Sequence, residues 1–206
     1  MISIIDYGMG NLYSVKNALN YVGLNSEITS DTRKIELSDA IILPGVGAFP
    51  DAMTMLTRHK LDELLIKQAD IKPILGICLG FQMLFTKSYE GGQTAGLGLM
   101  DGTVDLIKPV NKPGIWRYKV PHIGWNELVI TKQTPLTKGI HSGEAVYFVH
   151  SYMVSTTAEN TAAYCEHGTK ITAIAQKGNV YGAQFHPEKS GEIGLTMIKN
   201  FGEISK

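Results

Sequence analysis

One cysteine lies where a strand should turn directly into a helix. Pro73 to Ile77 is an apolar run typical of a buried strand, and Leu79 to Phe85 follows with helical character and no loop. Cys78 stands between them, with Gly76 and Gly80 two residues away on either side. In a nucleophile elbow, side chains at those two glycine positions would collide with neighbouring backbone. The pattern therefore predicts a cysteine nucleophile that is held clear of the sheet edge.

The expected turn also supplies an environment for that chemistry. A helix N-terminus favours the thiolate form of Cys78, because its free amides and its dipole stabilise an anion. The turn aims the backbone N–H of Leu79 at the oxygen of an attacked carbonyl, so we expect Leu79 to be an oxyanion donor. Most free cysteines are instead small buried apolar residues. We interpret Cys165 in that way, because it lies in a strand-like segment without such a turn.

A cysteine nucleophile needs a general base, and the base needs a group that fixes its tautomer. His186 ends the apolar run Val180–Phe185 and is followed by Pro187 and Glu188. In extended backbone His186 and Glu188 project to the same side, and Pro187 stiffens the pair. An isolated His–Glu pair would be an ordinary surface ion pair. Next to the predicted elbow, it instead predicts a catalytic triad of Cys78, His186 and Glu188.

Other sequence features are weaker candidates. His150 could compete as the base, but it lacks a nearby acid in sequence, so we place it in the wall of the substrate pocket. The turns Gly8–Gly10 and Gly45–Gly47 lack the third glycine of a dinucleotide-binding fingerprint. The histidines and cysteines lack paired metal-ligand spacing. We therefore expect neither a cofactor nor a metal.

The composition limits the class of protein. The chain has 206 residues, of which 44% are apolar and 18% charged, so we expect a single domain spanning residues 1–206. Nineteen basic residues balance nineteen acidic ones, which gives no electrostatic reason for a nucleic-acid or membrane partner. Two cysteines favour a reducing compartment. The run Met1–Ile5 is too short for a signal peptide, and no stretch is long enough to span a membrane, so we expect a cytoplasmic location.

The elements that must position these residues change character along the chain. Apolar runs at Ile2–Ile5, Ala40–Leu43 and Pro73–Ile77 alternate with amphipathic stretches, which predicts parallel strands covered by helices on both faces. In the second half Lys177–Asn179 suits a tight hairpin turn, and a helix over Ile193–Phe201 closes the chain. We expect an α/β fold with a mixed, mostly parallel central sheet flanked by helices and additional antiparallel strands in the second half. Those later strand-like segments are Thr103–Ile107, Glu127–Thr131, Ala145–Tyr152, Ile171–Gln176 and Asn179–Gln184.

These residues together resemble the class I glutamine amidotransferase family, whose triad is a cysteine on a G-x-C-x-G elbow and a His-Pro-Glu near the C-terminus. Within that class the chain looks most like the glutaminase subunits of imidazole glycerol phosphate synthase, from histidine biosynthesis. The resemblance implies the class I glutamine amidotransferase fold. The stretches that carry it span nearly the whole chain in the family's order: Asp6–Leu12, Leu43–Phe49, Pro121–Asn126, Phe148–Tyr152 and Phe185–Ser190.

The resemblance implies hydrolysis of glutamine to glutamate and ammonia through a thioester on Cys78. It implies that His186 protonates the departing ammonia and then activates water, while Glu188 holds His186 in place. It also implies a second oxyanion donor, the backbone N–H of Val46. The positions where relatives bind glutamine correspond to Gly47, Gln82, Ser151 and Tyr152.

The resemblance also implies a partner protein. In relatives the ammonia passes to a separate (β/α)₈ barrel cyclase subunit, which forms a heterodimer with the glutaminase and makes imidazole glycerol phosphate and AICAR. For Trp125, packing in the core is an equally good interpretation. The positions that match the shared interface are Asn11, Pro121, Ile123, Trp125, Tyr147 and Lys189.

The resemblance further implies that the enzyme hydrolyses almost no glutamine without its partner. One hypothesis is that the Val46 amide points away from the oxyanion until the partner binds, since Gly45 and Gly47 would permit a backbone flip.

Other functions stay open: a glutaminase of an anthranilate or pyridoxal phosphate synthase, a cysteine peptidase-like hydrolase on the same fold, or a binding module in which the elbow no longer has a catalytic role. Phe81 and Pro121–Asn126 fit the imidazole glycerol phosphate group better.

Overall fold

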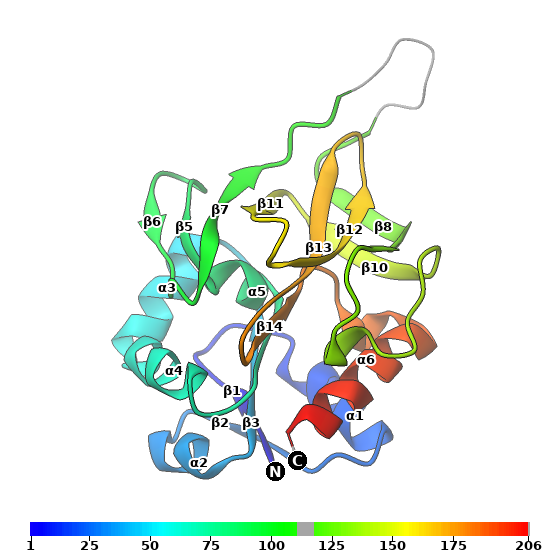
Figure 1. Ribbon diagram of the computed structural model, residues 1–206. Helices are drawn as coiled ribbons and strands as arrows, with labels where there is room; N and C mark the ends of the chain where they lie inside the picture. The colour runs from blue at the N-terminus through cyan, green and yellow to red at the C-terminus, as the bar shows by residue number, and fades with distance from the viewer. Residues whose placement is uncertain (111–117, 206) are drawn as a thin grey trace.

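The computed structural model describes residues 1–110 and 118–205, in which helices cover both faces of an eight-stranded sheet (Figure 1). The strand order is β2-β1-β3-β4-β14-β13-β12-β9, with parallel pairing from β2 to β14 and antiparallel pairing beyond. The expected mixed, mostly parallel sheet is therefore confirmed. The strands are β1 (Ile2–Ile5), β2 (Ser26–Thr29), β3 (Ala40–Gly45), β4 (Ile74–Cys78), β9 (Val129–Ile130), β12 (Thr161–Glu166), β13 (Lys170–Lys177) and β14 (Val180–Ala183).

Two smaller sheets lie at the end of the molecule opposite the chain termini (Figure 1). One is the antiparallel pair β8 (His122–Glu127) and β10 (Ala145–His150). The other has the order β11-β7-β5-β6. Because this end carries the carboxyl ends of the parallel strands, these sheets build walls around that edge. The four strands of the second sheet are β5 (Phe85–Ser88), β6 (Thr94–Ala95), β7 (Met100–Leu106) and β11 (Tyr152–Thr156).

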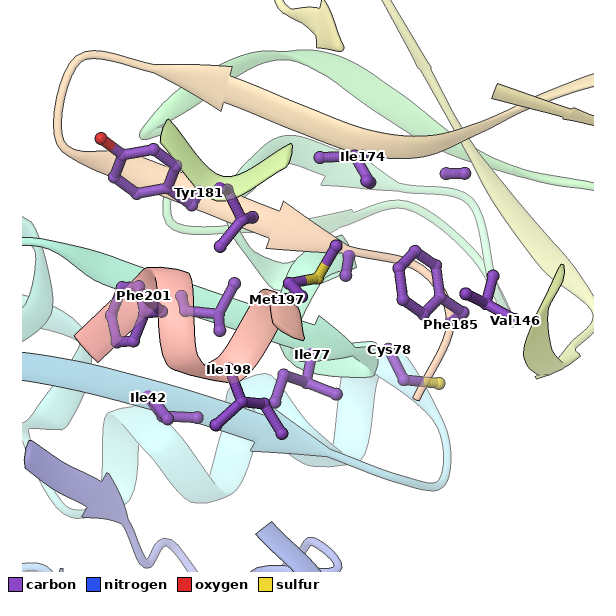
Figure 2. Close-up of a cluster of buried hydrophobic side chains, with 14 of the residues drawn as sticks. Ile42, Ile77, Cys78, Val146, Ile174, Tyr181, Phe185, Met197, Ile198 and Phe201 are labelled. Carbon is purple, nitrogen blue, oxygen red and sulfur yellow. The ribbon is translucent and has the colours of Figure 1, made fainter. Parts of the chain in front are cut away.

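The helices divide between the two faces of the large sheet because alternate strand residues point to opposite sides. Ile42 packs in a first hydrophobic cluster with α1 and α6. Its neighbours Ile41 and Leu43 pack in a second cluster with α2 to α5. Figure 2 shows Met197 and Phe201 of α6 in the first cluster, with Cys78 at its end. No helix among residues 1–110 and 118–205 is long and apolar enough to cross a membrane. The helices are α1 (Leu12–Tyr21), α2 (Thr32–Leu37), α3 (Phe49–Arg58), α4 (Leu61–Ala69), α5 (Leu79–Met83), α6 (Gly191–Ile204) and the short 3₁₀ turns η1 (Pro135–Thr137) and η2 (Pro187–Lys189).

Several local expectations need correction. The segment Ala145–Tyr152 is not one strand: β10 ends at His150, Ser151 breaks the pairing, and Tyr152 begins β11 in a different sheet. The segment Glu127–Thr131 likewise holds only the end of β8 and the short β9. The hairpin between β13 and β14 is confirmed, with Gly178 at a φ of 56°.

The two glycines around Cys78 allow strand and helix to meet as closely as backbone permits. A side chain at Gly80 would place its Cβ 1.8 Å from the carbonyl oxygen of Leu43 in β3. One at Gly76 would lie 2.7 Å from the Gly80 carbonyl oxygen. Cys78 itself has φ 55° and ψ −109°, a conformation that few residues other than glycine adopt. The predicted sharp turn from strand to helix, with Cys78 at the turn and a glycine on either side, is present.

Replacing Gly80 with alanine should lower the free energy of unfolding by about 3 kcal/mol or more, because α5 must move away from β3. Gly91→Ala is the control, since nothing lies within 4 Å of its Cβ position and only its φ of 64° is unfavourable. That control should cost about 1–2 kcal/mol. Urea denaturation measures both, and equal losses in the two variants would contradict the close approach at the elbow.

Candidate active site

Three neighbouring strands of the large sheet end at one cavity of about 340 Å³. Val46 follows β3, Cys78 ends β4, and His186 follows β14 by three residues. The carboxyl ends of parallel strands are the usual place for a site in an open α/β sheet. The cavity is lined by Val46, Gly47, Cys78, Leu79, Gln82, Glu90, Pro121, Val149, His150, Ser151, Tyr152 and His186.

The elbow presents Cys78 to this cavity. The residue is 7% exposed, and its Sγ lies 4.0 Å from the carbonyl oxygen of Val149 in β10. Leu79 is the first residue of α5, so its N–H has no acceptor one turn earlier in the helix. A thiol and the first backbone N–H of a helix therefore lie side by side at the same wall, as the sequence predicts.

His186 and Glu188 form a buried pair behind the thiol. His186 Nδ1 and Glu188 Oε1 are 2.8 Å apart, and the two side chains are 4% and 1% exposed. Because Nδ1 faces the carboxylate, Nε2 remains for Cys78. Glu188 does not line the cavity, so the geometry gives it access to the histidine and not to a bound molecule.

The position of His186 is fixed by bonds to a different sheet. Its backbone N–H donates to the Tyr147 carbonyl at 3.0 Å, and the Ser190 hydroxyl donates to the His186 carbonyl at 2.7 Å. The same hydroxyl accepts the Tyr147 N–H at 3.0 Å. Ser190 is the N-cap residue of α6, but its side chain caps no helix N–H and serves this linkage instead.

The charges around His186 favour its protonated form. Burial lowers the pKa, but hydrogen bonds and charges from Cys78 and Glu188 outweigh burial and raise the pKa of His186 to about 9. At neutral pH the imidazole is therefore a cation between a carboxylate and the sulfur. A cationic imidazole is the partner that a thiolate nucleophile requires.

The pocket wall next to the thiol is held by side-chain amides. Gln82 Nε2 donates to the Tyr152 carbonyl at 2.9 Å and to Gln184 Oε1 at 3.0 Å. The Ser151 carbonyl accepts from the Ile107 N–H at 2.9 Å. With both carbonyls of the 151–152 segment engaged, N–H groups are what its backbone has left to offer a ligand.

The loop after β3 rests on the loop after β1. The buried Tyr7 hydroxyl donates to the Pro44 carbonyl at 3.0 Å, and Met9 lies against Gly47, whose φ is 94°. Val46 is 41% exposed, and its N–H has no acceptor among residues 1–110 and 118–205. The loop is thus anchored at its start, while the Val46 N–H is left without an acceptor in the described part of the chain.

One residue of the site, Glu90, has no clear signal in the sequence. Glu90 lines the cavity and accepts the Phe49 N–H at 2.9 Å, yet it lies in a turn without any motif.

His150 cannot serve as the base, because both ring nitrogens are engaged, Nδ1 with the Tyr152 carbonyl at 2.8 Å and Nε2 with His122 at 3.0 Å. Among the described residues no cluster of three or more histidine, cysteine or acidic side chains could hold a metal ion.

The residues expected at a partner interface are mostly at the surface. Ile123 and Trp125 are each 60% exposed on β8, so the alternative that Trp125 packs in the core is wrong. The Trp125 ring contacts Tyr147 edge to face, at a centroid distance of 6.1 Å. Pro121 is exposed beside the cavity that it lines. Lys189 is also exposed, whereas Asn11 and Tyr147 are half-buried.

Comparison with known proteins gives consistent results. Residues 3–204 match the family described as glutamine amidotransferase class-I. Imidazole glycerol phosphate synthase subunit HisH of Caldanaerobacter subterraneus subsp. tengcongensis is 52% identical, over 100% of this chain and 99% of that protein. The subunit of the same name from Shouchella clausii is 49% identical, over 99% and 98%.

Solved structures show the same fold at low identity. A crystal structure of a glutamine amidotransferase is 17% identical with a TM-score of 0.76, covering 99% of this chain and 98% of that one. The structure of PurLQS from Thermotoga maritima is 23% identical with a TM-score of 0.74, covering 100% and 98%. The expected fold class is therefore confirmed.

The pH dependence of His186 tests the buried pair. A folded pKa of about 9 against an ordinary 6.5 means that the pair stabilises the fold fully below pH 6.5 and that this stability is lost as the pH rises to about 9. Glu188→Gln should lower the His186 midpoint by at least about 1 pH unit and flatten that loss. The measurements are NMR titration and denaturation against pH.

The control is Glu192→Gln, the same change at an exposed position in the first turn of α6. It should leave the His186 midpoint and the pH dependence of stability as they are. A wild-type midpoint near 6.5, or identical behaviour of the two variants, would contradict the assigned ion pair.

Proposed function

Because this chain belongs to the class I glutamine amidotransferase family, among the imidazole glycerol phosphate synthase subunits HisH, we propose that Cys78 attacks glutamine and that the ammonia passes to a cyclase subunit. The chain is thus a glutaminase of histidine biosynthesis. The observation that carries the proposed chemistry is the meeting of Cys78 and His186 at one cavity, with the buried Glu188 bonded to His186.

In the first step the Cys78 thiolate adds to the side-chain carbonyl carbon of glutamine. The negative charge moves to the carbonyl oxygen, and the N–H groups of Leu79 and Val46 stabilise it, each such donor contributing about 3–4 kcal/mol. His186 then gives its Nε2 proton to the amide nitrogen, the C–N bond breaks, and ammonia leaves a thioester. Water, deprotonated by His186, attacks the thioester and releases glutamate. Glu188 keeps His186 oriented throughout.

The cavity offers a complementary group for each part of glutamine. The N–H groups of the 151–152 segment, which have no acceptor in the described part of the chain, suit the α-carboxylate. Glu90 is the one carboxylate among the described lining residues, so it suits the α-ammonium. Gln82 has both N–H groups engaged, which leaves its Oε1 as an acceptor. Gly47 lets the substrate approach the backbone beside Val46.

The face around the cavity mouth suits the cyclase, a (β/α)₈ barrel in our proposal, as a heterodimeric partner that makes imidazole glycerol phosphate and AICAR. Val46, Ile123 and Trp125 expose apolar surface there. Exposed aromatic anchors of this kind carry much of the affinity in interfaces. Asn11, Pro121, Tyr147 and Lys189 complete the proposed contact surface. We place this complex in the cytoplasm, which fits the two free cysteines.

The loop after β3, which carries Val46, is the target that we assign to partner docking. The Val46 N–H is untethered in the described structure, whereas Tyr7 anchors the preceding Pro44 carbonyl. We propose that the partner turns the Val46 peptide toward the oxyanion, which couples glutamine hydrolysis to the cyclase. A structure of the isolated chain with that N–H already aimed beside the Leu79 amide, combined with low activity, would overturn the coupling.

Glutamate release from glutamine tests the proposed function. The isolated chain should be slow, and its rate should rise by orders of magnitude with the cyclase subunit and its ribonucleotide ligand. Cys78→Ala should reduce the stimulated rate at least about 10³-fold with folding intact. Cys165→Ala is the matched control and should keep the rate. Activity on peptides would favour the cysteine peptidase alternative, and indifference to the partner would overturn the assignment to this synthase.

Trp125→Ala tests the docking face separately from the chemistry. Loss of an exposed aromatic anchor should raise the dissociation constant of the cyclase complex about 30-fold or more. Leu37→Ala, 84% exposed on the distant α2, is the control and should change nothing. Calorimetric titration of the two subunits measures both. An unchanged affinity in Trp125→Ala would place the cyclase on another surface.

A further inference from the structure

A pair of buried histidines lies between the candidate cavity and the outer strand β8. His150 ends β10, lines the cavity and is 7% exposed. His122 begins β8 directly opposite His150 in the strand register and is 3% exposed. The reaction steps above use neither ring, so their burial needs another explanation.

The hydrogen bonds of these rings can run in only one direction. The Tyr152 carbonyl only accepts, so His150 Nδ1, 2.8 Å away, must carry the proton. In a neutral ring His150 Nε2 then accepts, so His122 Nδ1, 3.0 Å away, must donate. His122 Nε2 in turn accepts from Asn126 Nδ2 at 3.2 Å. The result is an ordered chain from Asn126 through both rings to the Tyr152 carbonyl.

The surroundings keep both rings neutral. Burial lowers the pKa of His150 to about 4 and that of His122 to about 3. The charge of the nearby His167 lowers both pKa values further, and that of His186 lowers the pKa of His150. His167 also stacks on His122 with ring centroids 4.0 Å apart. A proton on His150 Nε2 would also face the N–H of His122. The chain therefore keeps one direction at neutral pH.

We propose that His122 and His150 are positioning residues that fix the Tyr152 carbonyl and, through it, the side-chain amide of Gln82 in the glutamine pocket. The Tyr152 carbonyl accepts from both His150 and Gln82, so its orientation is set by two donors. The second N–H of Gln82 goes to Gln184, which turns Gln82 Oε1 into the group available to substrate. This role rests on the proposed glutaminase function, because it concerns the same pocket.

The outer end of the chain reaches the proposed docking strand. Asn126 Nδ2 also donates to the Glu166 carbonyl at 3.0 Å, and Asn126 Oδ1 accepts the Glu127 N–H at 2.9 Å. Asn126 is thus fixed on the strand that exposes Ile123 and Trp125. The pocket and the exposed face of β8 are therefore joined by four side chains and one carbonyl.

Two substitutions at His150 separate positioning from packing. Asparagine keeps an N–H near the place of Nδ1, whereas glutamine keeps an acceptor near the place of Nε2 but offers the Tyr152 carbonyl no donor. In the complex with the cyclase subunit, His150→Gln should raise KM for glutamine about tenfold with kcat within about threefold. His150→Asn should keep KM within about threefold of wild type. Equal KM values in the two variants, or a loss confined to kcat, would overturn the proposal.

The tautomers can be measured without any activity. Imidazole nitrogen NMR of the isolated chain at pH 7 should show both His122 and His150 protonated at Nδ1 alone. A proton on Nε2 of either ring would overturn the chain. If a His150 variant unfolds, as thermal unfolding would show, His122→Asn and His122→Gln make the same comparison one step further out. An inactive wild-type complex would refute the proposed function and leave the tautomer result standing.

Discussion

The close approach of α5 to β3 and β4 is the constraint on which the site depends. The helix begins at the residue after the strand ends, so Cys78 must take a backbone conformation that costs about 1–3 kcal/mol. Packing sustains that conformation. Phe81 occupies the space in which Gly182 of β14 would need a side chain, with a ring carbon 2.0 Å from that Cβ position. On the β3 side, the Leu43 carbonyl occupies the space that a side chain at Gly80 would need. The helix therefore packs closely against strands on two sides.

The β8–β10 pair is the second support, and it acts on all parts of the site at once. The Tyr147 backbone binds the segment that carries His186, the Val149 carbonyl lies beside the Cys78 sulfur, and His150 holds the Tyr152 carbonyl. The proposed base, the proposed nucleophile and the candidate pocket are therefore all positioned by one short strand, β10. A shift of β10 by a fraction of an ångström would alter all three distances together.

The sequence predicts the sheet and the proximity of Cys78, His186 and Glu188 well, because these depend on local patterns. A strand that turns into a helix between two glycines, and a His-Pro-Glu after an apolar strand, each set their own geometry. The break at Ser151 was not predictable in this way, because Ala145–Tyr152 alternates like one strand and only the pairing with two different sheets divides it. Glu90 was missed for a related reason. Its role follows from a contact with Phe49, 41 residues away, and no local pattern encodes that contact.

The alternation of side chains along β8 connects the buried chemistry to the surface. His122 points into the molecule and begins the hydrogen-bonded chain that ends at the candidate pocket, whereas Ile123 and Trp125 point outward. In a strand these two sets cannot move independently, because the same backbone carries both. In the proposed complex, a partner seated on the outer residues therefore acts on the position of His122 and Asn126 without touching the pocket. In the proposed complex the Val46 N–H, which has no acceptor among the described residues, is a second and separate route from the docked cyclase to the bound glutamine.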